Sequence, residues 1–237
     1  MTYVRLPLKN TYNTRELGGY STKTGQTKWH TFLRSDDLHQ LEPVDFELLQ
    51  RYGITKIIDL RSEGELQRAP HPENSPFDYL NIPLAVGDIT DMTQVDYANY
   101  TLIEGYKQMI EASQAAIKQV FDCLVEQTGV LFHCAGGKDR TGIIAALILG
   151  SVGVAKEDII ANYQTTATYL AQNPALVDMV KEFSSDISHL GHSDAQTMKE
   201  LLDFIDEKYQ DIPTYLAKIG VSKNQQRQLQ ALFVTIN

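Results

Sequence analysis

The sequence predicts an α/β fold in which a mostly parallel central sheet is flanked by helices. Short β-branched apolar runs alternate with helical patterns along the first two thirds of the chain, and only helical patterns follow the last of these runs. Parallel strands need intervening crossovers, which are usually helices, so this alternation indicates a parallel sheet. The chain has 237 residues, of which 43% are hydrophobic and 22% charged, and it can therefore bury a substantial core.

The N-terminal part is expected to supply the first strands and one helix. Residues 18–33 have β-branched and aromatic residues on both sides of a glycine-containing turn, which predicts two short strands. A helix is expected from Pro43, which suits a first helical position, to Gly53, which suits a left-handed cap. Residues 54–60 are β-branched and apolar, and they predict a buried strand.

The middle of the chain continues the alternation. A proline-containing loop at 70–76 precedes a short strand at 79–84, and residues 86–96 are expected to form an acidic surface loop. Apolar residues at helical spacing then predict one long helix over 97–126. Residues 129–133 are a further buried strand.

Glycines separate this last strand from the helical part of the chain. An apolar helix is expected at 141–152, and everything from Lys156 onward has a helical pattern. The predicted stretches are 156–171, 175–184, 194–209, 213–219 and a last helix after the capping-box signature at Ser222. We expect a single domain over 1–237, with an α/β core at 13–155 and a helical cover or subdomain at 156–237.

Composition limits the classes of partner and compartment. The formal charge of −9 disfavours binding to nucleic acid and stable association with anionic membranes. The two cysteines, Cys123 and Cys134, cannot form a disulfide framework, so a reducing compartment is expected. No apolar run is long enough to be a signal peptide or to span a bilayer, which favours a cytoplasmic protein. Oligomeric state is left open.

The stretch from His133 to Gly142 has the residues that phosphate-ester chemistry needs. Cys134 lies between a strand and a helix, where the positive field of the helix N-terminus stabilises a thiolate. Two glycines allow the backbone to curl so that its N–H groups surround three phosphoryl oxygens. Arg140, six positions after the cysteine, can bind two of those oxygens with its planar fork. The expected phosphate loop is Ala135, Gly136, Gly137, Lys138, Asp139 and Arg140.

Neighbouring residues have candidate supporting roles. Thr141 can donate its hydroxyl to the thiolate, and His133 can orient the loop through a backbone hydrogen bond. Lys138 is either a second cation for substrates with several phosphates or a solvated loop lysine. Asp59 and Arg61 follow a buried strand, where they either brace the loop, help to bind substrate, or only form a salt bridge that closes the strand end.

These residues resemble the Cys-x5-Arg signature of protein tyrosine phosphatases. The ending at 138–142 is similar to that of an atypical bacterial branch, which also accepts phosphoserine, phosphothreonine and phosphoinositides, and blocks at 13–20, 33–38 and 53–65 are similar to the same branch. The resemblance implies a cysteine-phosphatase-like fold and a phosphocysteine intermediate, without metal or other cofactor. Without it, Asn13, Arg15 and Arg34 would be interpreted as residues of turns and surface ion pairs.

The general acid needs a separate assignment. Better-known tyrosine phosphatases carry a Trp-Pro-Asp loop, whereas the single tryptophan here, Trp29, is followed by His30. The resemblance makes Asp139 the first candidate, although two neighbouring cations favour its ionised form and weaken it as an acid. The alternatives are, in order, Asp88, Asp91 or Asp96 of the acidic loop, and Asp59 at its strand end.

The expected function is hydrolysis of phosphate monoesters by a tyrosine phosphatase, with dual specificity a possible extension. The substrate is expected to be a phosphorylated protein or a small phosphorylated molecule, and the acidic chain makes a membrane-embedded phosphoinositide the less favoured choice. Alternatives are a phosphoinositide or inositol-phosphate phosphatase, an inactive phosphate-binding module and a sulfurtransferase. Cys123 is expected in the core, with a protective disulfide to Cys134 as a minority hypothesis.

Overall fold

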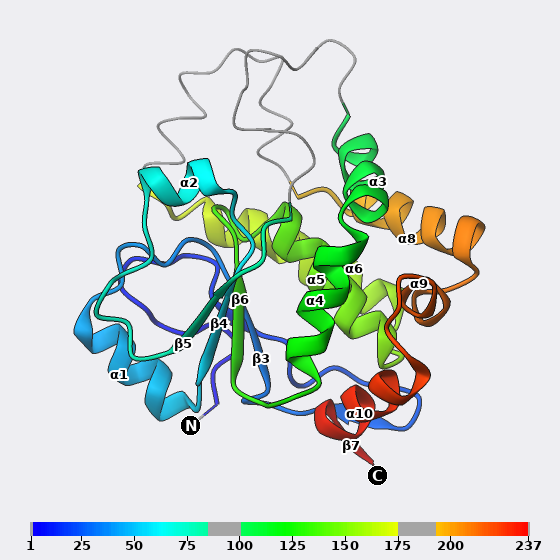
Figure 1. The fold of residues 1–237 in the computed structure, drawn as a ribbon, viewed down its shortest axis with the longest axis horizontal. Helices are drawn as coiled ribbons and strands as arrows, with labels where there is room; N and C mark the ends of the chain where they lie inside the picture. The colour runs from blue at the N-terminus through cyan, green and yellow to red at the C-terminus, as the bar shows by residue number, and fades with distance from the viewer. Residues whose placement is uncertain (1, 85–100, 175–192, 237) are drawn as a thin grey trace.

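The central sheet has five strands in the order β1-β3-β6-β4-β5 (Figure 1). The computed structural model describes residues 2–84, 101–174 and 193–236. Strands β3, β6, β4 and β5 are parallel, and β1 is antiparallel to β3, so the predicted mostly parallel sheet is confirmed. The strands are β1 (Arg15–Glu16), β3 (Phe32–Ser35), β4 (Lys56–Asp59), β5 (Asp78–Asn81) and β6 (Val130–His133).

Both faces of the sheet are covered, because successive side chains of a strand point to opposite faces. Leu33, Ile57 and Leu131 pack with helix α1 (Pro43–Tyr52) on one face. Residues one position further along these strands, such as Phe132, pack with the remaining helices on the other face. Burial on both faces explains why the strands are continuous apolar runs rather than alternating ones.

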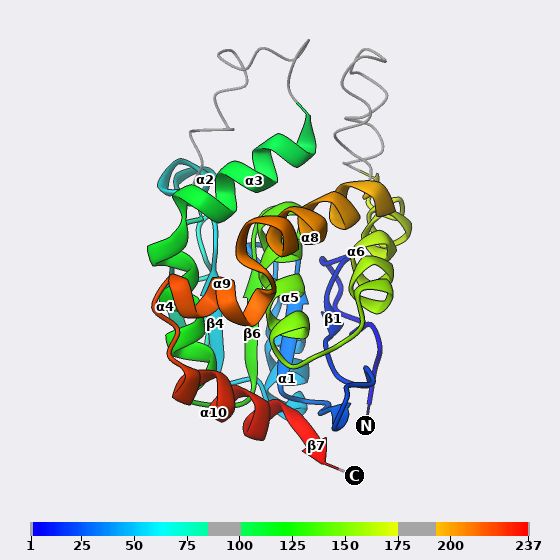
Figure 2. The same ribbon diagram turned by 90° about the vertical axis from the view of Figure 1, so that its right-hand side faces the viewer.

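The long helix predicted at 97–126 is two helices, α3 (Leu102–Ala112) and α4 (Gln114–Leu124). Ser113 separates them with non-helical backbone angles, φ −99° and ψ 22°, and the helices meet there at a bend (Figure 2). Both helices carry an apolar stripe at the same spacing, so periodicity alone does not reveal the break. Residues 97–100 and the predicted acidic loop at 86–96 lie outside the described residues.

Helices follow the last strand of the sheet, as predicted. They are α5 (Asp139–Ser151), α6 (Lys156–Leu170), α8 (Ala195–Tyr209), α9 (Ile212–Lys218) and α10 (Lys223–Phe233). Leu201, Tyr215 and Phe233 belong to the same hydrophobic cluster as Phe32 and Phe132, so the C-terminal helices cover the sheet. The helix predicted at 175–184 lies outside the described residues.

The prediction that everything after Lys156 is helical is wrong at the end. Strand β7 (Val234–Ile236) pairs antiparallel with β2 (Gly25–Thr27). The glycine-containing turn predicted within 18–33 is present, since Ser21 and Gln26 form an antiparallel bridge and Thr22 N donates to Gly25 O at 2.8 Å, but the second side of the turn, β2, also pairs with β7. A Cβ at Gly25 would lie 1.8 Å from the carbonyl oxygen of Thr235, so glycine is what allows β7 to approach.

Two elements, β1 and α2 (Glu63–Arg68), are too short to have been predicted from the spacing of their apolar residues. Strand β1 has two residues, and helix α2 has six. None of the helices in the described ranges has the length and apolar character to cross a membrane.

Candidate active site

The loop from Cys134 to Lys138 joins β6 to α5, as the strand, glycine turn and helix pattern predicts. Helix α5 begins at Asp139, two residues before the predicted start, so its N-terminal N–H groups and positive field lie directly at the loop. Cys134 is only 2% exposed. Gly137 has a φ of +63°, and a Cβ there would lie 2.5 Å from the carbonyl oxygen of Ser35, so this position requires glycine.

Three consecutive carbonyl oxygens of the loop are held by the N-terminal segment of the chain. The bonds run from Asp37 N to Ala135 O at 2.9 Å, from Asn13 Nδ2 to Gly136 O at 3.1 Å and Gly137 O at 3.0 Å, and from Arg34 Nη2 to Gly137 O at 2.7 Å. In a trans peptide the N–H points opposite to the C=O. Holding these carbonyls outward therefore turns loop amides inward, where they can receive an anion.

Asn13, Arg15 and Arg34 are buried, so their interpretation as residues of surface ion pairs is wrong. They lie on or beside β1 and β3, and β3 pairs with β6, which ends at His133, one residue before Cys134. Arg15 donates to both oxygens of Asn13, to the carbonyl oxygen of Asn162 at 2.7 Å and to Thr166 Oγ1 at 2.9 Å. These bonds fix the asparagine that holds the loop.

Arg140 is gripped by Glu65 of helix α2. Its two Nη atoms donate to Glu65 Oε2 at 2.5 Å and Oε1 at 2.7 Å, and within the described residues its Nε makes no hydrogen bond. The Nε edge of the fork is therefore left for a phosphoryl group. Burial disfavours ionisation of Glu65, but the hydrogen bonds from Arg140 outweigh it and hold the pKa of Glu65 below its ordinary value.

Glu65 was missed as a site residue. The backbone N–H of Ser62 donates to Glu65 Oε2 at 2.8 Å, so the same carboxylate completes the capping box of α2. The Ser-x-x-Glu spacing was the available signal, but it predicts a helix start rather than a contact with Arg140.

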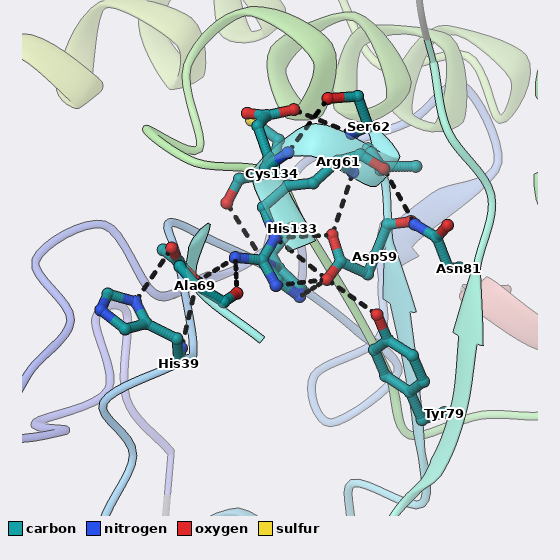
Figure 3. A network of polar contacts seen from close by, with 12 residues as sticks. His39, Asp59, Arg61, Ser62, Ala69, Tyr79, Asn81, His133 and Cys134 are labelled. Carbon is teal, nitrogen blue, oxygen red and sulfur yellow. Dashed lines mark hydrogen bonds and ion pairs between the residues drawn. The ribbon is translucent and has the colours of Figure 1, made fainter. Parts of the chain in front are cut away.

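Asp59 and Arg61 form a buried pair beneath the loop (Figure 3). Register between β4 and β6 places Asp59 beside His133, whose Nε2 lies 3.4 Å from Asp59 Oδ2 and whose Nδ1 donates to Cys134 O at 3.1 Å. Tyr79 also donates its hydroxyl to Asp59, at 3.1 Å. These contacts brace the loop, as one of the sequence interpretations had it.

The salt bridge that was the alternative interpretation is present as well, with Arg61 Nη2 at 2.7 Å from Asp59 Oδ2, whereas direct substrate binding by this pair does not fit. Arg61 is buried, and it donates to both oxygens of Asp59, to Asp37 Oδ1 and to the carbonyl oxygen of Ala69, so it is not presented to a substrate. Burial disfavours the ionised form of Asp59, but the facing His133 and Arg61 outweigh it and lower the pKa of Asp59. A fully buried, paired carboxylate is not placed to protonate a leaving group.

His71 stacks on Tyr79 beside this network, with ring centroids 4.1 Å apart, and its two ring nitrogens are buried without a hydrogen-bond partner. Burial lowers the pKa of His71 to about 4. As the pH falls, His71 is therefore protonated in the unfolded chain before it is protonated in the folded one. Its contribution to the free energy of unfolding is complete above about pH 6.5 and is lost as the pH falls from about 6.5 to about 4. The shift corresponds to about 3 kcal/mol, which solvent screening at this half-buried ring reduces to about 1–2 kcal/mol.

Replacing this ring tests its contribution to acid stability. His71→Phe keeps the stack on Tyr79 and removes the titration, so its free energy of unfolding should fall by about 1–2 kcal/mol less than that of the wild type between pH 7 and pH 4.5. Urea denaturation at the two pH values measures the difference. Equal losses in both proteins would contradict the prediction.

Asp139 is held by a tyrosine pair. Tyr106 of α3 donates its hydroxyl to Asp139 Oδ1 at 2.5 Å, and its oxygen lies 2.7 Å from that of Tyr163 of α6. Lys138 Nζ lies 3.4 Å from the same Oδ1. Both contacts reach one carboxylate oxygen, and the side chain of Asp139 is 40% exposed. The Lys138 side chain is only 7% exposed, so its interpretation as a solvated lysine is wrong.

The remaining predicted residues lie where the sequence suggested. Thr141 Oγ1 is buried without a hydrogen-bond partner among the described residues, so its hydroxyl is not committed to another group there. Cys123 packs in the core on α4, burial raises its pKa, and both cysteines are free thiols. Among the described residues, no group of three or more histidine, cysteine or acidic side chains is arranged to hold a metal.

Comparison with known proteins gives one family. The profile of the tyrosine phosphatase family matches residues 6–235. The chain is 34% identical to a tyrosine-protein phosphatase of Nostoc commune over 84% of this chain and 72% of that protein. It is 27% identical to the triple specificity protein phosphatase PtpB of Mycobacterium tuberculosis, over 80% of this chain and 86% of that one.

One solved structure that matches the chain has a lower sequence identity than these two relatives. A complex of TpbA from P. aeruginosa with phosphotyrosine is 16% identical, with a TM-score of 0.41 and coverage of 89% of this chain and 92% of that one.

Proposed function

Because the chain belongs to the tyrosine phosphatase family and is a phosphomonoesterase of that family, we propose that it works through a phosphocysteine intermediate on Cys134. The observation that carries this proposal is the loop itself. Asn13 and Arg34 hold its carbonyl oxygens, which turns its amides inward. Cys134 precedes the N-terminus of α5, and Arg140 is the second residue of that helix. This arrangement supplies a nucleophile and donors for the transferring phosphoryl group.

In the first step the Cys134 thiolate attacks phosphorus. A sulfur–phosphorus bond forms while the bond from phosphorus to the leaving oxygen breaks. Arg140 and the loop amides bind the equatorial oxygens, and the grip of Glu65 holds the guanidinium in its orientation before substrate arrives. Asp139 gives its proton to the leaving oxygen, which departs as the alcohol or phenol.

In the second step water cleaves the phosphocysteine. Asp139, now ionised, accepts a proton from the attacking water, and the sulfur–phosphorus bond breaks to release phosphate and the thiolate. The uncommitted hydroxyl of Thr141 is suited to donate a hydrogen bond to the departing sulfur.

Two observations support Asp139 as the acid. Tyr106 fixes one of its oxygens, and its carboxyl is partly exposed. Arg140, one of the two cations that argued against it, is already paired with Glu65. The acidic-loop candidates Asp88, Asp91 and Asp96 lie outside the described residues, and Asp59 is buried in its own pair.

For the substrate we propose phosphotyrosine in proteins, with phosphoserine and phosphothreonine accepted as well. The names of the relatives, a tyrosine-protein phosphatase and a triple specificity protein phosphatase, support this class. Lys138 pairs with Asp139 and is almost buried, so it does not favour a substrate with several phosphates. Turnover of phosphotyrosine, phosphoserine and phosphothreonine peptides, and of soluble inositol phosphates as the competing class, tests the order.

Trapping the intermediate tests the mechanism. Acid quenching during turnover of an aryl phosphate should leave phosphate on the peptide that contains Cys134 and none on the peptide that contains Cys123, as mass spectrometry can show. Phosphate on another residue would contradict the proposal. If burst kinetics show that hydrolysis of an intermediate limits the rate, the intermediate must accumulate during turnover. Turnover without any covalent phosphate under those conditions would also contradict the proposal.

Replacing the acid gives a prediction about pH. Asp139→Asn should lower kcat by about 10²–10³-fold for alkyl phosphates such as phosphoserine, whose leaving group needs a proton, and should flatten the basic limb of the pH profile. An aryl phosphate with a good leaving group is the internal control, because it should lose far less. An unchanged basic limb would move the role to Asp88, Asp91 or Asp96.

A further inference from the structure

The cations around the loop are paired with carboxylates in the described part of the chain, except for two buried arginines, Arg15 and Arg34, and Arg15 donates only to Asn13, Asn162 and Thr166. Arg140 is paired with Glu65, Lys138 Nζ lies close to Asp139, and Arg61 is paired with both Asp59 and Asp37. Arg34 on β3 is different. The hydrogen-bond partners of Arg34 are neutral, namely Asn162 Oδ1 at 2.6 Å from Nη1 and Gly137 O at 2.7 Å from Nη2, and it forms no ion pair with any carboxylate in the part of the chain that the structure describes.

Such a cation is costly to keep. Arg34 is 1% exposed, and its Nε is buried without a hydrogen-bond partner. Removing a guanidinium from water without a counter-charge is unfavourable by several kcal/mol in general. A buried charge of this kind is retained when an anion faces it in the working state of the protein.

The neighbours of Arg34 identify that anion. The alternation along β3 puts Arg34 on the sheet face that carries Phe132, under the loop and against α5 and α6. The titratable groups that face it are Cys134, Tyr20, Tyr163 of α6 and Tyr106 of α3, with the guanidinium of Arg15 from β1 behind. Tyr106 and Tyr163 remain neutral near pH 7, since burial raises the pKa of both.

Burial lowers the pKa of Arg34 to about 10, and the charge of Cys134 is the largest effect that opposes this lowering. Arg34 is therefore still charged at neutral pH. Among the other basic groups of the site, Arg140 is compensated by Glu65, and burial lowers the pKa of His133 and of Arg15.

We propose that Arg34, the uncompensated arginine that binds the loop directly through the carbonyl of Gly137, stabilises the thiolate of Cys134. Arg34 lies beneath the loop and does not contact substrate, so it is a positioning residue. Its charge stabilises the thiolate, and its hydrogen bond holds the carbonyl of Gly137. The proposal rests on the role of Cys134 as nucleophile in the proposed function, and it adds a source of thiolate stabilisation that lies outside the loop.

One position separates a role in charge from a role in shape. Asn162→Asp keeps the size of the side chain, keeps an acceptor for Arg34 and lets the Tyr20 hydroxyl, now a partner of Asn162 Nδ2 at 2.9 Å, donate instead. It also brings a carboxylate to Arg34 and neutralises it. Asn162→Ala does the opposite, because it removes the contacts and leaves the charge.

The readout is alkylation of Cys134 by iodoacetamide as a function of pH, in a Cys123→Ser background so that a single thiol reacts. Asn162→Asp should move the midpoint of the alkylation curve upward by about one pH unit or more, which slows alkylation at low pH by about tenfold. Asn162→Ala should leave the midpoint within about 0.3 unit of the parent protein, which sets the scale for a charge effect.

The reverse ranking, with Asn162→Ala shifting the midpoint and Asn162→Asp leaving it, would overturn the proposal in favour of a purely structural role. If Asn162→Asp does not fold, Arg34→Gln and Arg34→Lys form a second pair, in which only the loss of charge in Arg34→Gln should raise the midpoint. A raised midpoint in both, or in neither, would contradict the proposal. Alkylation is measured without turnover, so failure of the phosphocysteine mechanism would be seen separately, in the trapping experiment.

Discussion

Replacing Cys134 by serine is expected to lower kcat for an aryl phosphate by about 10⁴-fold or more. A serine hydroxyl in the same place is un-ionised at neutral pH, and Asp139, which we propose as the acid for the leaving group, is bound by Tyr106. The side chain is 2% exposed and differs from serine by one atom, so the free energy of unfolding should change by less than about 2 kcal/mol.

Cys123→Ser is the matched control for this experiment. Cys123 is also buried, but it packs on α4 in the core and is absent from the loop. This variant should keep kcat within about twofold of the wild type, while its stability falls by about 1 kcal/mol because a hydroxyl replaces a buried thiol. If Cys134→Ser kept a tenth or more of the activity, the nucleophile would have to be another residue.

Gly137→Ala is expected to have the second largest effect, on stability and activity together. Its φ of +63° is strained for a residue with a Cβ, and that Cβ would meet Ser35 O at 2.5 Å and Asp36 N at 2.6 Å. These contacts are with backbone, which cannot rotate away, so the loop must move from β3. We expect a loss of about 2–4 kcal/mol in stability and about 100-fold or more in kcat, since the loop carbonyls would lose their donors.

Gly136→Ala is the control for that variant, one residue earlier in the same loop. A Cβ at Gly136 would have no atom within 4 Å, and its φ lies outside the left-handed region. Its melting temperature should stay within about 2 °C of the wild type, whereas that of Gly137→Ala should fall by several degrees. Equal melting temperatures for the two variants would show that the approach of β3 to the loop does not constrain Gly137.

The elements that could be predicted from sequence are those whose pattern is local. Helix α1 has its proline start and glycine end, and β4 and β6 are apolar runs between clear boundaries. The break at Ser113 and the pairing of β7 with β2 could not be predicted this way. The first depends on how two amphipathic helices pack, and the second joins residues about 210 positions apart in the chain.

In the candidate site, too, the residues with a local sequence pattern could be predicted and those brought in by tertiary contacts could not. The residues of the loop from Cys134 to Arg140 are contiguous, so one motif predicts them together. The residues that shape the loop are not contiguous with it: Glu65 grips Arg140, and Tyr106 binds Asp139. Each of these side chains has an ordinary local explanation, as a helix cap or as part of an apolar stripe, and only the tertiary structure shows its partner.

The distance along the chain between the loop and the side chains that tie it also has a kinetic consequence. Asn13 and Arg34 are separated from the loop glycines that they bind by 123, 124 and 103 residues. Contacts of such separation form late in folding, because the intervening chain must be ordered first. During refolding, helical circular dichroism should therefore recover before phosphate release does. The recovery of catalytic activity therefore reports when the N-terminal segment packs onto the loop after β6. Until then the folding chain does not hydrolyse phosphate esters.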